Sequence, residues 1–181
     1  MREVEVKYRV SDLEALLSAL KTRGIELSDP VYQDDQAYAP IGWDFGDSKL
    51  GVSFLRLRTV DGRHYFALKQ PAGNAQDCLE YETEVADREA MNGAILRMGY
   101  RPTVRVAKTR RVSSLADFSL CVDDLEGVGA FVELERLVPD EADADIVQSE
   151  LAGFVASLDI AAARTAETYD SLVRTAQEAS R

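Results

Sequence analysis

The chain has 181 residues, of which 46% are hydrophobic and 29% charged, so it is long enough for one compact domain with a substantial core. Its 32 acidic and 21 basic residues give a net charge of −11, which argues against a general nucleic-acid binder or a protein that binds an anionic membrane. Two cysteines and one histidine exclude a disulfide framework and a multi-histidine zinc site. Because the sequence contains neither a long apolar run nor a signal-peptide pattern, we expect a cytoplasmic protein.

Hydrophobic periodicity in the first half of the chain predicts strands and one helix. Residues 2–10 alternate between charged and apolar side chains, as a half-buried strand does. Ser11 begins a capping-box pattern for an amphipathic helix that ends at Gly24. The dipeptide Asp61-Gly62 predicts a tight hairpin turn. Further strands are expected over residues 31–38, 52–60, 63–70 and 79–86.

The second half of the chain repeats these patterns. Apolar residues from Met91 to Met98 have helical spacing, and Gly99 ends that helix. The acidic run over residues 140–145 suits the start of a longer helix, and a last helix begins near Thr168. Strands are expected over residues 104–112, 118–122 and 131–137. The sequence therefore predicts an α+β domain dominated by antiparallel strands.

Charged side chains recur at every second position on these strands. Arg56 and Arg58 share one strand face, whereas Leu55 and Leu57 share the other. The same spacing holds for Glu3, Glu5, Lys7, Glu80, Glu82, Glu84, Lys108, Arg110, Glu133 and Glu135, and Lys69 and Asp123 are further charged positions. On one strand alone, the solvent-exposed face of an antiparallel sheet explains such charge. On all strands together, the pattern favours a sheet that curls into a barrel with a charged interior.

Such an interior is costly unless a ligand or metal compensates the charge. The basic residues can neutralise a polyphosphate, and arginine suits bidentate contact with phosphate. The carboxylates repel phosphate, so they require a hard divalent cation, Mg²⁺ or Mn²⁺, between them and the ligand. A polyphosphate bound with a metal ion explains both signs of charge.

The ordered motifs resemble those of the CYTH superfamily, the triphosphate tunnel metalloenzymes, which include class IV adenylyl cyclases and thiamine triphosphatases. The matching segments are Glu3-Val-Glu-Val-Lys7, Leu55-Arg-Leu-Arg58, Lys69, Lys108-Thr-Arg110, the segment from Asp123 to Glu135, and Thr168-Tyr-Asp-Ser-Leu172. The resemblance covers nearly the whole chain. It implies a closed antiparallel barrel of about eight strands with flanking helices, formed by a single domain over residues 1–175 and followed by a polar tail over 176–181.

The resemblance also implies roles for individual residues. The expected metal ligands are Glu3, Glu5, Glu82, Glu133 and Glu135, with Glu80 as the alternative to Glu82. The expected triphosphate ligands are Lys7, Arg56, Arg58, Lys69, Lys108, Arg110 and Arg164. The expected catalytic residues are Glu133, Asp123 and Lys69.

By resemblance, we expect an adenylyl cyclase that converts ATP to cyclic AMP and pyrophosphate with Mg²⁺ or Mn²⁺. A triphosphatase acting on thiamine triphosphate or inorganic tripolyphosphate is the first alternative, and a non-catalytic polyphosphate or nucleotide binder is the second. Trp43 and Phe45 either stack on the organic part of the substrate or cover the tunnel mouth or a dimer contact. The expected partner is a triphosphate-containing small molecule, without nucleic acid or membrane, and a homodimer is possible.

Overall fold

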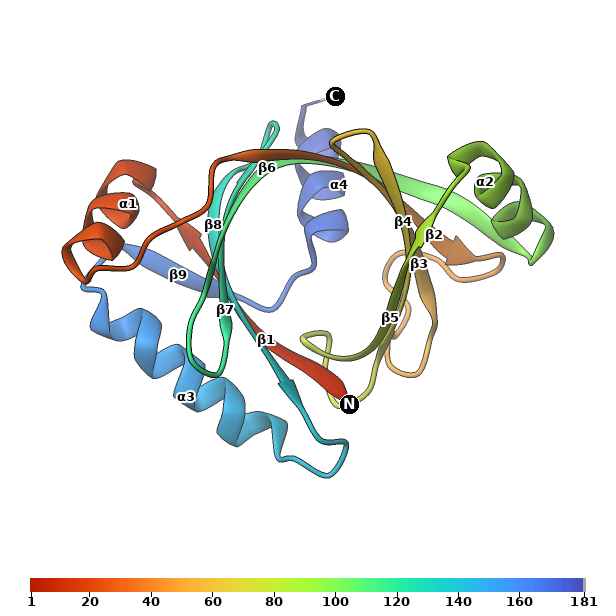
Figure 1. The fold of residues 1–181 in the computed structure, drawn as a ribbon. Coiled ribbons are helices and arrows are strands. Elements are labelled where there is room, and N and C mark those ends of the chain that lie inside the picture. Colours follow the sequence, from red (N-terminus) through yellow and green to blue (C-terminus); the bar gives the residue numbers. More distant parts are fainter. Residues whose placement is uncertain (181) are drawn as a thin grey trace.

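The computed structural model describes residues 1–180, which form a barrel with flanking helices (Figure 1). The strands are β1 (Arg2–Val10), β2 (Val31–Pro40), β3 (Phe54–Val60), β4 (Arg63–Pro71), β5 (Asp77–Val85), β6 (Tyr100–Ser114), β7 (Ser119–Leu125), β8 (Gly129–Val138) and β9 (Ala162–Thr165). The helices are α1 (Leu13–Thr22), α2 (Arg88–Arg97), α3 (Ala144–Ser157) and α4 (Tyr169–Ala179). Over the described residues, no helix combines the length and apolar character required to span a membrane.

Eight of the strands close into an antiparallel barrel, as predicted. Their order is β5-β4-β3-β2-β6-β7-β8-β1, and β1 pairs back to β5 through Arg2, Glu3 and Val4. The later part of β1 pairs with β9 instead, so β9 extends the sheet without belonging to the closed ring. The ring abolishes most of the open strand edge that a flat sheet of this size would expose.

Helices cover the apolar outer faces of the strands. On one side, α1 and α3 pack on β1, β7 and β8, where Val6 and Leu134 are buried with Leu151 (Figure 1). On the opposite side, α2 packs on β2 and β3, with Ile95 against Leu57 (Figure 1). Burial of each such side chain contributes about 1.5–3 kcal/mol. Because the apolar faces of these strands pack against helices, their charged faces point into the barrel.

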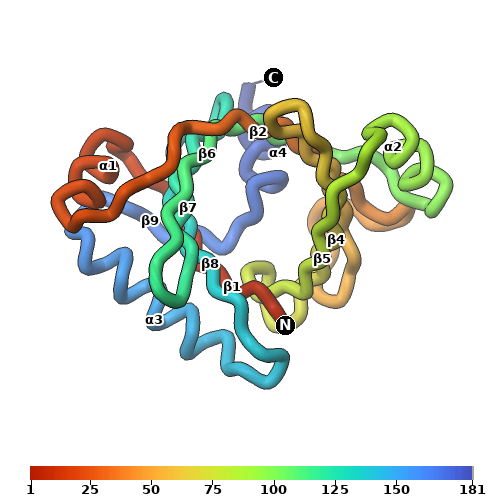
Figure 2. The backbone as a smooth tube through the Cα atoms, in the orientation of Figure 1, coloured from red at the N-terminus to blue at the C-terminus, as the bar shows by residue number. Residues whose placement is uncertain are grey.

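Helix α4 lies across part of the barrel opening (Figure 2). Its apolar side chains pack against the barrel strands there. At this end, the inward faces of β6 and β8 carry Val104, Val106 and Phe131 in place of charged residues. They pack against Val173 and Tyr169 of α4. The barrel interior is therefore apolar at the α4 end and charged farther along.

The N-cap of α1 differs by one residue from the capping-box prediction. Asp12, and not Ser11, caps the helix, because the Asp12 carboxylate accepts a hydrogen bond from the Ala15 backbone N–H at 2.9 Å. The predicted end of the helix is confirmed, since Gly24 adopts a positive φ of 70°.

The C-terminal region also differs from the expectation. Strand β9 was not predicted, because its four residues lack a hydrophobic alternation and it forms by pairing with the free edge of β1. Helix α4 continues to Ala179, into the stretch expected to be a polar tail over 176–181. Arg181, the last residue of that stretch, lies outside the described residues.

Candidate active site

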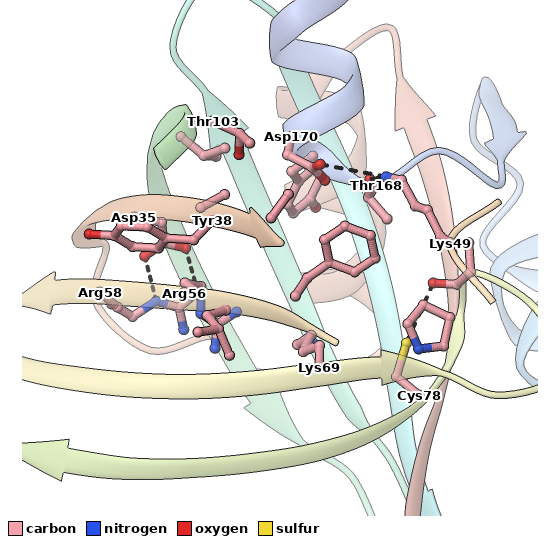
Figure 3. A pocket seen from close by; sticks show the side chains of 18 of the residues that line it. Asp35, Tyr38, Lys49, Arg56, Arg58, Lys69, Cys78, Thr103, Thr168 and Asp170 are labelled. Carbon is pink, nitrogen blue, oxygen red and sulfur yellow. Dashed lines mark hydrogen bonds and ion pairs between the residues drawn. The ribbon is translucent and has the colours of Figure 1, made fainter. Parts of the chain in front are cut away.

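A cavity of about 180 Å³ lies inside the barrel (Figure 3). Its charged lining comes from β1, β2, β3, β4, β6 and β8 and includes Glu5, Lys7, Asp35, Arg56, Arg58, Lys69, Lys108, Arg110, Glu133 and Glu135. Another part of the lining is aromatic and apolar, with Trp43, Phe54 and Pro71. The period-two alternation of the strands brings charges that are far apart in sequence to this one space.

Three carboxylates form a cluster that could hold a metal ion. Glu3, Glu5 and Glu135 each offer an oxygen, and these oxygens lie within 4.8 Å of one another. The register of β1 and β8 produces this approach, because Glu5 pairs directly with Glu135. Burial raises the pKa of all three carboxyls, and the negative charge of Glu133 raises those of Glu5 and Glu135 further. Burial and neighbouring negative charge therefore disfavour the ionised form of these carboxyls.

Glu133 lies beside this cluster in a different electrostatic setting. Its carboxylate is 3.5 Å from the Lys7 ammonium and 3.5 Å from the Arg110 guanidinium. Burial opposes ionisation, but the charges of Lys7 and Arg110 outweigh it and hold the pKa of Glu133 well below its usual range. Glu133 is thus ionised at neutral pH, and one of its oxygens has no hydrogen-bond partner among the described residues.

Carboxylates orient the arginines of β3. Arg58 donates two hydrogen bonds of 2.8 Å to Asp35 on β2, in the planar fork that also suits a phosphate (Figure 3). Despite its burial, Asp35 has a pKa lowered to about 2 by the hydrogen bond from Arg58 and the charge of Arg56. Arg56 contacts Glu82 at 2.6 Å and Glu80 at 3.3 Å.

Lys69 links two acidic strands at the edge of the cluster. Its ammonium lies 3.0 Å from Glu3 on β1 and 2.7 Å from Glu80 on β5. Burial opposes its charge, but Glu3 and Glu80 outweigh that effect and raise the pKa of Lys69 well above the usual lysine value. Lys69 therefore remains a cation and is suited to neutralising charge on a bound anion.

Asp123 is fully enclosed by donors. Arg110 donates to its two carboxylate oxygens at 2.7 and 2.6 Å, Tyr169 donates at 2.7 Å and Lys108 at 3.3 Å. Its side chain has no exposed surface. Burial opposes ionisation, but Lys108 and Arg110 lower the pKa of Asp123 below its ordinary value. The Asp123 carboxylate thus orients the side chains of Arg110 and Lys108.

A family model described as the CYTH domain matches residues 1–169 of the sequence. The chain belongs to the CYTH domain family. This match confirms the resemblance drawn from the sequence motifs, and the closed antiparallel barrel agrees with it.

Curated relatives of this chain carry adenylate cyclase names. A protein of Methanocaldococcus jannaschii named "Putative adenylate cyclase MJ0240" is 28% identical over 162 residues, which cover 88% of this chain and 91% of the relative. Adenylate cyclase CyaB of Aeromonas hydrophila is 32% identical over 145 residues, covering 77% of this chain and 71% of the relative.

A solved structure extends the comparison to the fold. HpAC1 from Hippeastrum, described as having a dominant triphosphatase activity, has a TM-score of 0.67 and 18% identity, covering 97% of this chain and 96% of its own. At this identity, the likeness shows a common fold only.

The structure of this CYTH domain brings most of the predicted ligands together. The predicted cations Lys7, Arg56, Arg58, Lys69, Lys108 and Arg110 all line the cavity. Arg164 is not among these lining residues: it is exposed on β9 and pairs with Tyr8, whose side chain packs on the outer core. Paired residues point to the same side of a sheet, so Arg164 lies outside the barrel.

The two glutamates weighed on β5, Glu82 and Glu80, lie in different surroundings. Glu82 is not part of the carboxylate cluster, and its side chain remains 39% exposed beside Arg56. Glu80 is the glutamate of β5 that shares the Lys69 ammonium with Glu3. Glu80 directly follows the part of β5 that pairs with β1, whereas Glu82 lies two residues farther along the strand. Glu80 therefore borders the cluster.

Asp35 was missed by sequence reasoning. Asp34 and Asp35 are adjacent, so the alternation does not show which of them faces inward. Asp34 pairs with Arg105 at 2.9 Å, and that pair is exposed, whereas Asp35 pairs with Arg58 in the cavity.

The aromatic loop before β3 covers one end of the cavity. Trp43 is 8% exposed and packs edge-to-face on Phe45 and Phe54, with centroid distances of 5.2 and 4.9 Å. Lys49 was also missed, and it lies near Thr168 at the start of α4 (Figure 3). It connects the loop to this helix by donating hydrogen bonds of 2.7 Å to Thr168 and 2.9 Å to Ser171. The loop and α4 together bound the apolar end of the cavity.

Proposed function

We propose that this CYTH protein is a metal-dependent enzyme that binds ATP in its barrel and converts it to cyclic AMP and pyrophosphate. The proposal is carried by one juxtaposition: a set of buried and partly buried cations shares the barrel interior with three carboxylates that lie within 4.8 Å of one another. A protein that only binds polyphosphate needs the cations but not the carboxylates, because carboxylates repel this ligand. A metal ion bound between the carboxylates and the phosphates would turn that repulsion into attraction. The adenylate cyclase names of the curated relatives support the reaction chosen.

The carboxylate cluster fits a small divalent cation. Glu3, Glu5 and Glu135 provide the hard oxygen donors that Mg²⁺ and Mn²⁺ prefer. Their raised pKa values reflect burial and mutual repulsion, which a cation would relieve. Bound there, such an ion supplies Lewis-acid polarisation of phosphate oxygens. Glu133, ionised beside the cluster, is assigned to the same metal environment.

The cations of the barrel would hold the triphosphate and neutralise its charge. In cyclisation, the ribose 3′-oxygen loses its proton and bonds to the α-phosphorus, while the bond from that phosphorus to the pyrophosphate oxygen breaks. Negative charge then grows on the leaving pyrophosphate. Arg56, Arg58 and Arg110 are already oriented by carboxylates, so they can meet this charge with little reorganisation. Lys69, which remains protonated, contributes a further fixed charge.

The aromatic end of the cavity gives the organic part of a nucleotide a place to bind. Trp43, Phe54 and Pro71 line this part, adjoining the charged part of the same cavity. Inorganic tripolyphosphate has no group that would use these contacts. This arrangement favours a substrate in which a triphosphate carries a ring system.

A triphosphatase is the second candidate, because HpAC1, which shares the fold, is described as having a dominant triphosphatase activity. In that reaction water attacks the terminal phosphorus, and the bond to the bridging oxygen breaks. The same cations and carboxylates serve this hydrolysis, with thiamine triphosphate or tripolyphosphate as further substrates. The position of the nucleophile relative to the phosphate chain decides between the two reactions.

Product identification tests the proposal. The purified protein is incubated with ATP, thiamine triphosphate or tripolyphosphate, each with Mg²⁺, Mn²⁺ or a chelator, and the products are identified by ³¹P NMR and chromatography. Cyclic AMP with pyrophosphate supports the cyclase, and orthophosphate release identifies a triphosphatase. Absence of product from all three substrates, together with a rise in melting temperature on adding tripolyphosphate, would leave only a binding module.

A further inference from the structure

Tyr169 contacts two of the cations assigned to the triphosphate. It is the first residue of α4, and its ring lies 4.3 Å from the Lys7 ammonium and 4.6 Å from the Lys108 ammonium, measured to the ring centroid. Lys7 belongs to β1 and Lys108 to β6, and these strands are not neighbours in the sheet. One aromatic ring thus joins two like charges from separate parts of the barrel wall.

The hydroxyl of Tyr169 belongs to the same group of contacts. It donates to Asp123 at 2.7 Å, and that carboxylate also accepts the fork from Arg110. Burial, together with the negative charges of Glu133 and Asp123, raises the pKa of Tyr169 well above 10, so the hydroxyl keeps its proton and remains a donor. Ring and hydroxyl together contact Lys7, Lys108 and Asp123.

These contacts matter because lysine is a flexible ligand. Its ammonium ends a four-carbon stem with many rotamers, and two buried ammonium groups repel each other. A tyrosine has only two side-chain torsions, and its ring face attracts cations. Phe131 packs edge-to-face on the Tyr169 ring with a centroid distance of 5.4 Å, which restrains that ring in turn.

We propose that Tyr169 is a positioning residue for triphosphate binding: its ring holds the Lys7 and Lys108 ammonium groups facing the cavity, and its hydroxyl steadies the Asp123–Arg110 fork. This role rests on the proposed function, since it assigns the two lysines to the bound phosphates. It makes the first turn of α4 part of the binding site. A purely structural role would require only the apolar packing of α4 against Phe131 and Val106.

Three variants separate these roles. Tyr169→Phe removes the hydroxyl and keeps the ring, whereas Tyr169→Leu removes both. Val173→Ala is the matched control, because Val173 packs α4 on the same apolar cluster but has neither an aromatic ring nor a hydroxyl. Affinity for tripolyphosphate in the presence of Mg²⁺ is measured by calorimetry, and melting temperatures of the free proteins show how far each variant loosens the fold.

We expect Tyr169→Leu to raise the Kd about tenfold and Tyr169→Phe to raise it less than about threefold, because the ring carries the cation contacts. Val173→Ala should lower the melting temperature and leave the Kd unchanged. If Tyr169→Leu bound within twofold of the wild type, or if Val173→Ala weakened binding as much as Tyr169→Leu, Tyr169 would have a structural role only.

A second measurement needs no phosphate ligand. In the free protein, the ring current of Tyr169 should shift the Hε protons of Lys7 and Lys108 upfield in NMR spectra, in the wild type and in Tyr169→Phe but not in Tyr169→Leu. Absence of these shifts from the wild type would overturn the proposal. Failure of the wild type to bind tripolyphosphate would instead contradict the proposed function, and the role of Tyr169 with it. If the wild type binds normally and the variants have the same Kd, only the role of Tyr169 is contradicted.

Discussion

Arg110 and Asp123 form a forked ion pair inside the barrel, with the arginine Nε and Nη2 atoms 2.7 and 2.6 Å from the two carboxylate oxygens. Tyr169 and Lys108 donate to the same carboxylate, which leaves it no contact with the cavity. The motif resemblance implies a catalytic role for Asp123. The geometry favours an indirect role, in which Asp123 fixes the direction of the Arg110 guanidinium.

Asp123→Asn should destabilise the protein by about 3 kcal/mol, because it removes the charge that compensates a buried guanidinium and ammonium. The free energy of unfolding is measured by urea denaturation. Asp124→Asn is the control, since Asp124 is the exposed neighbour on the same strand, and a change within about 0.5 kcal/mol is expected there. Equal effects of the two substitutions would contradict the assigned role of Asp123.

Glu135→Gln should lower the metal-dependent rate at least about 100-fold, because it removes one oxygen ligand from the carboxylate cluster. Turnover is measured with ATP and with tripolyphosphate over a series of Mn²⁺ concentrations, and Mn²⁺ binding is followed by electron paramagnetic resonance. Glu84→Gln is the matched control, since Glu84 lies on the exposed part of β5 and forms an ion pair with Arg63 of β4. Wild-type Mn²⁺ binding in Glu135→Gln would rule out the cluster as the metal site.

Arg56→Ala should weaken tripolyphosphate binding about tenfold and leave orthophosphate binding nearly unchanged, because one of several charge-assisted contacts along the phosphate chain is lost. Arg105→Ala, which removes an exposed arginine paired with Asp34 outside the cavity, should affect neither ligand. Both affinities are measured by calorimetry at one salt concentration. Equal losses for the two phosphates would argue against a series of cations along the barrel.

Triphosphate binding should weaken above pH 8. Burial, with a further contribution from the Arg110 charge, lowers the pKa of Lys108 to about 8. Below this pH the ammonium is already charged, so affinity should be constant, whereas above it binding must take up a proton and the Kd should rise by up to about tenfold per pH unit. The Kd for tripolyphosphate is measured from pH 7 to 9.5.

Lys108→Arg provides the control for this pH dependence. Arginine stays charged over the whole range, and the ligand's own ionisation is the same in both proteins. The difference between the two profiles therefore isolates the lysine. Identical profiles for Lys108→Arg and the wild type would show that Lys108 does not lose its charge near pH 8.

Most of the fold could be predicted from local sequence patterns. The strict alternation over residues 2–10 and the Asp61-Gly62 turn correspond to β1 and to the β3–β4 hairpin, where Asp61 and Gly62 adopt positive φ values of 48° and 75°. Strand β9 could not be predicted, because its four residues show no alternation of apolar and polar side chains. Its pairing partner is the far edge of β1, more than 150 positions away in the sequence.

The candidate site was predictable only in its composition. Alternation identified Lys108 and Arg110 as sharing a face, but it could not show that their partner is Asp123 on the next strand. It also could not separate Asp34 from Asp35, because adjacent identical residues leave the inward face undefined.

The sequence by itself determined which face of each strand is charged, since the period of two is a property of a single extended segment. Only the tertiary structure decided which charges meet. Strand register places Glu5 opposite Glu135, barrel closure brings Glu3 to Lys69 and Glu80, and the pairing of β9 directs Arg164 away from the cavity. These relations depend on contacts between segments far apart in the chain, and no local pattern encodes them.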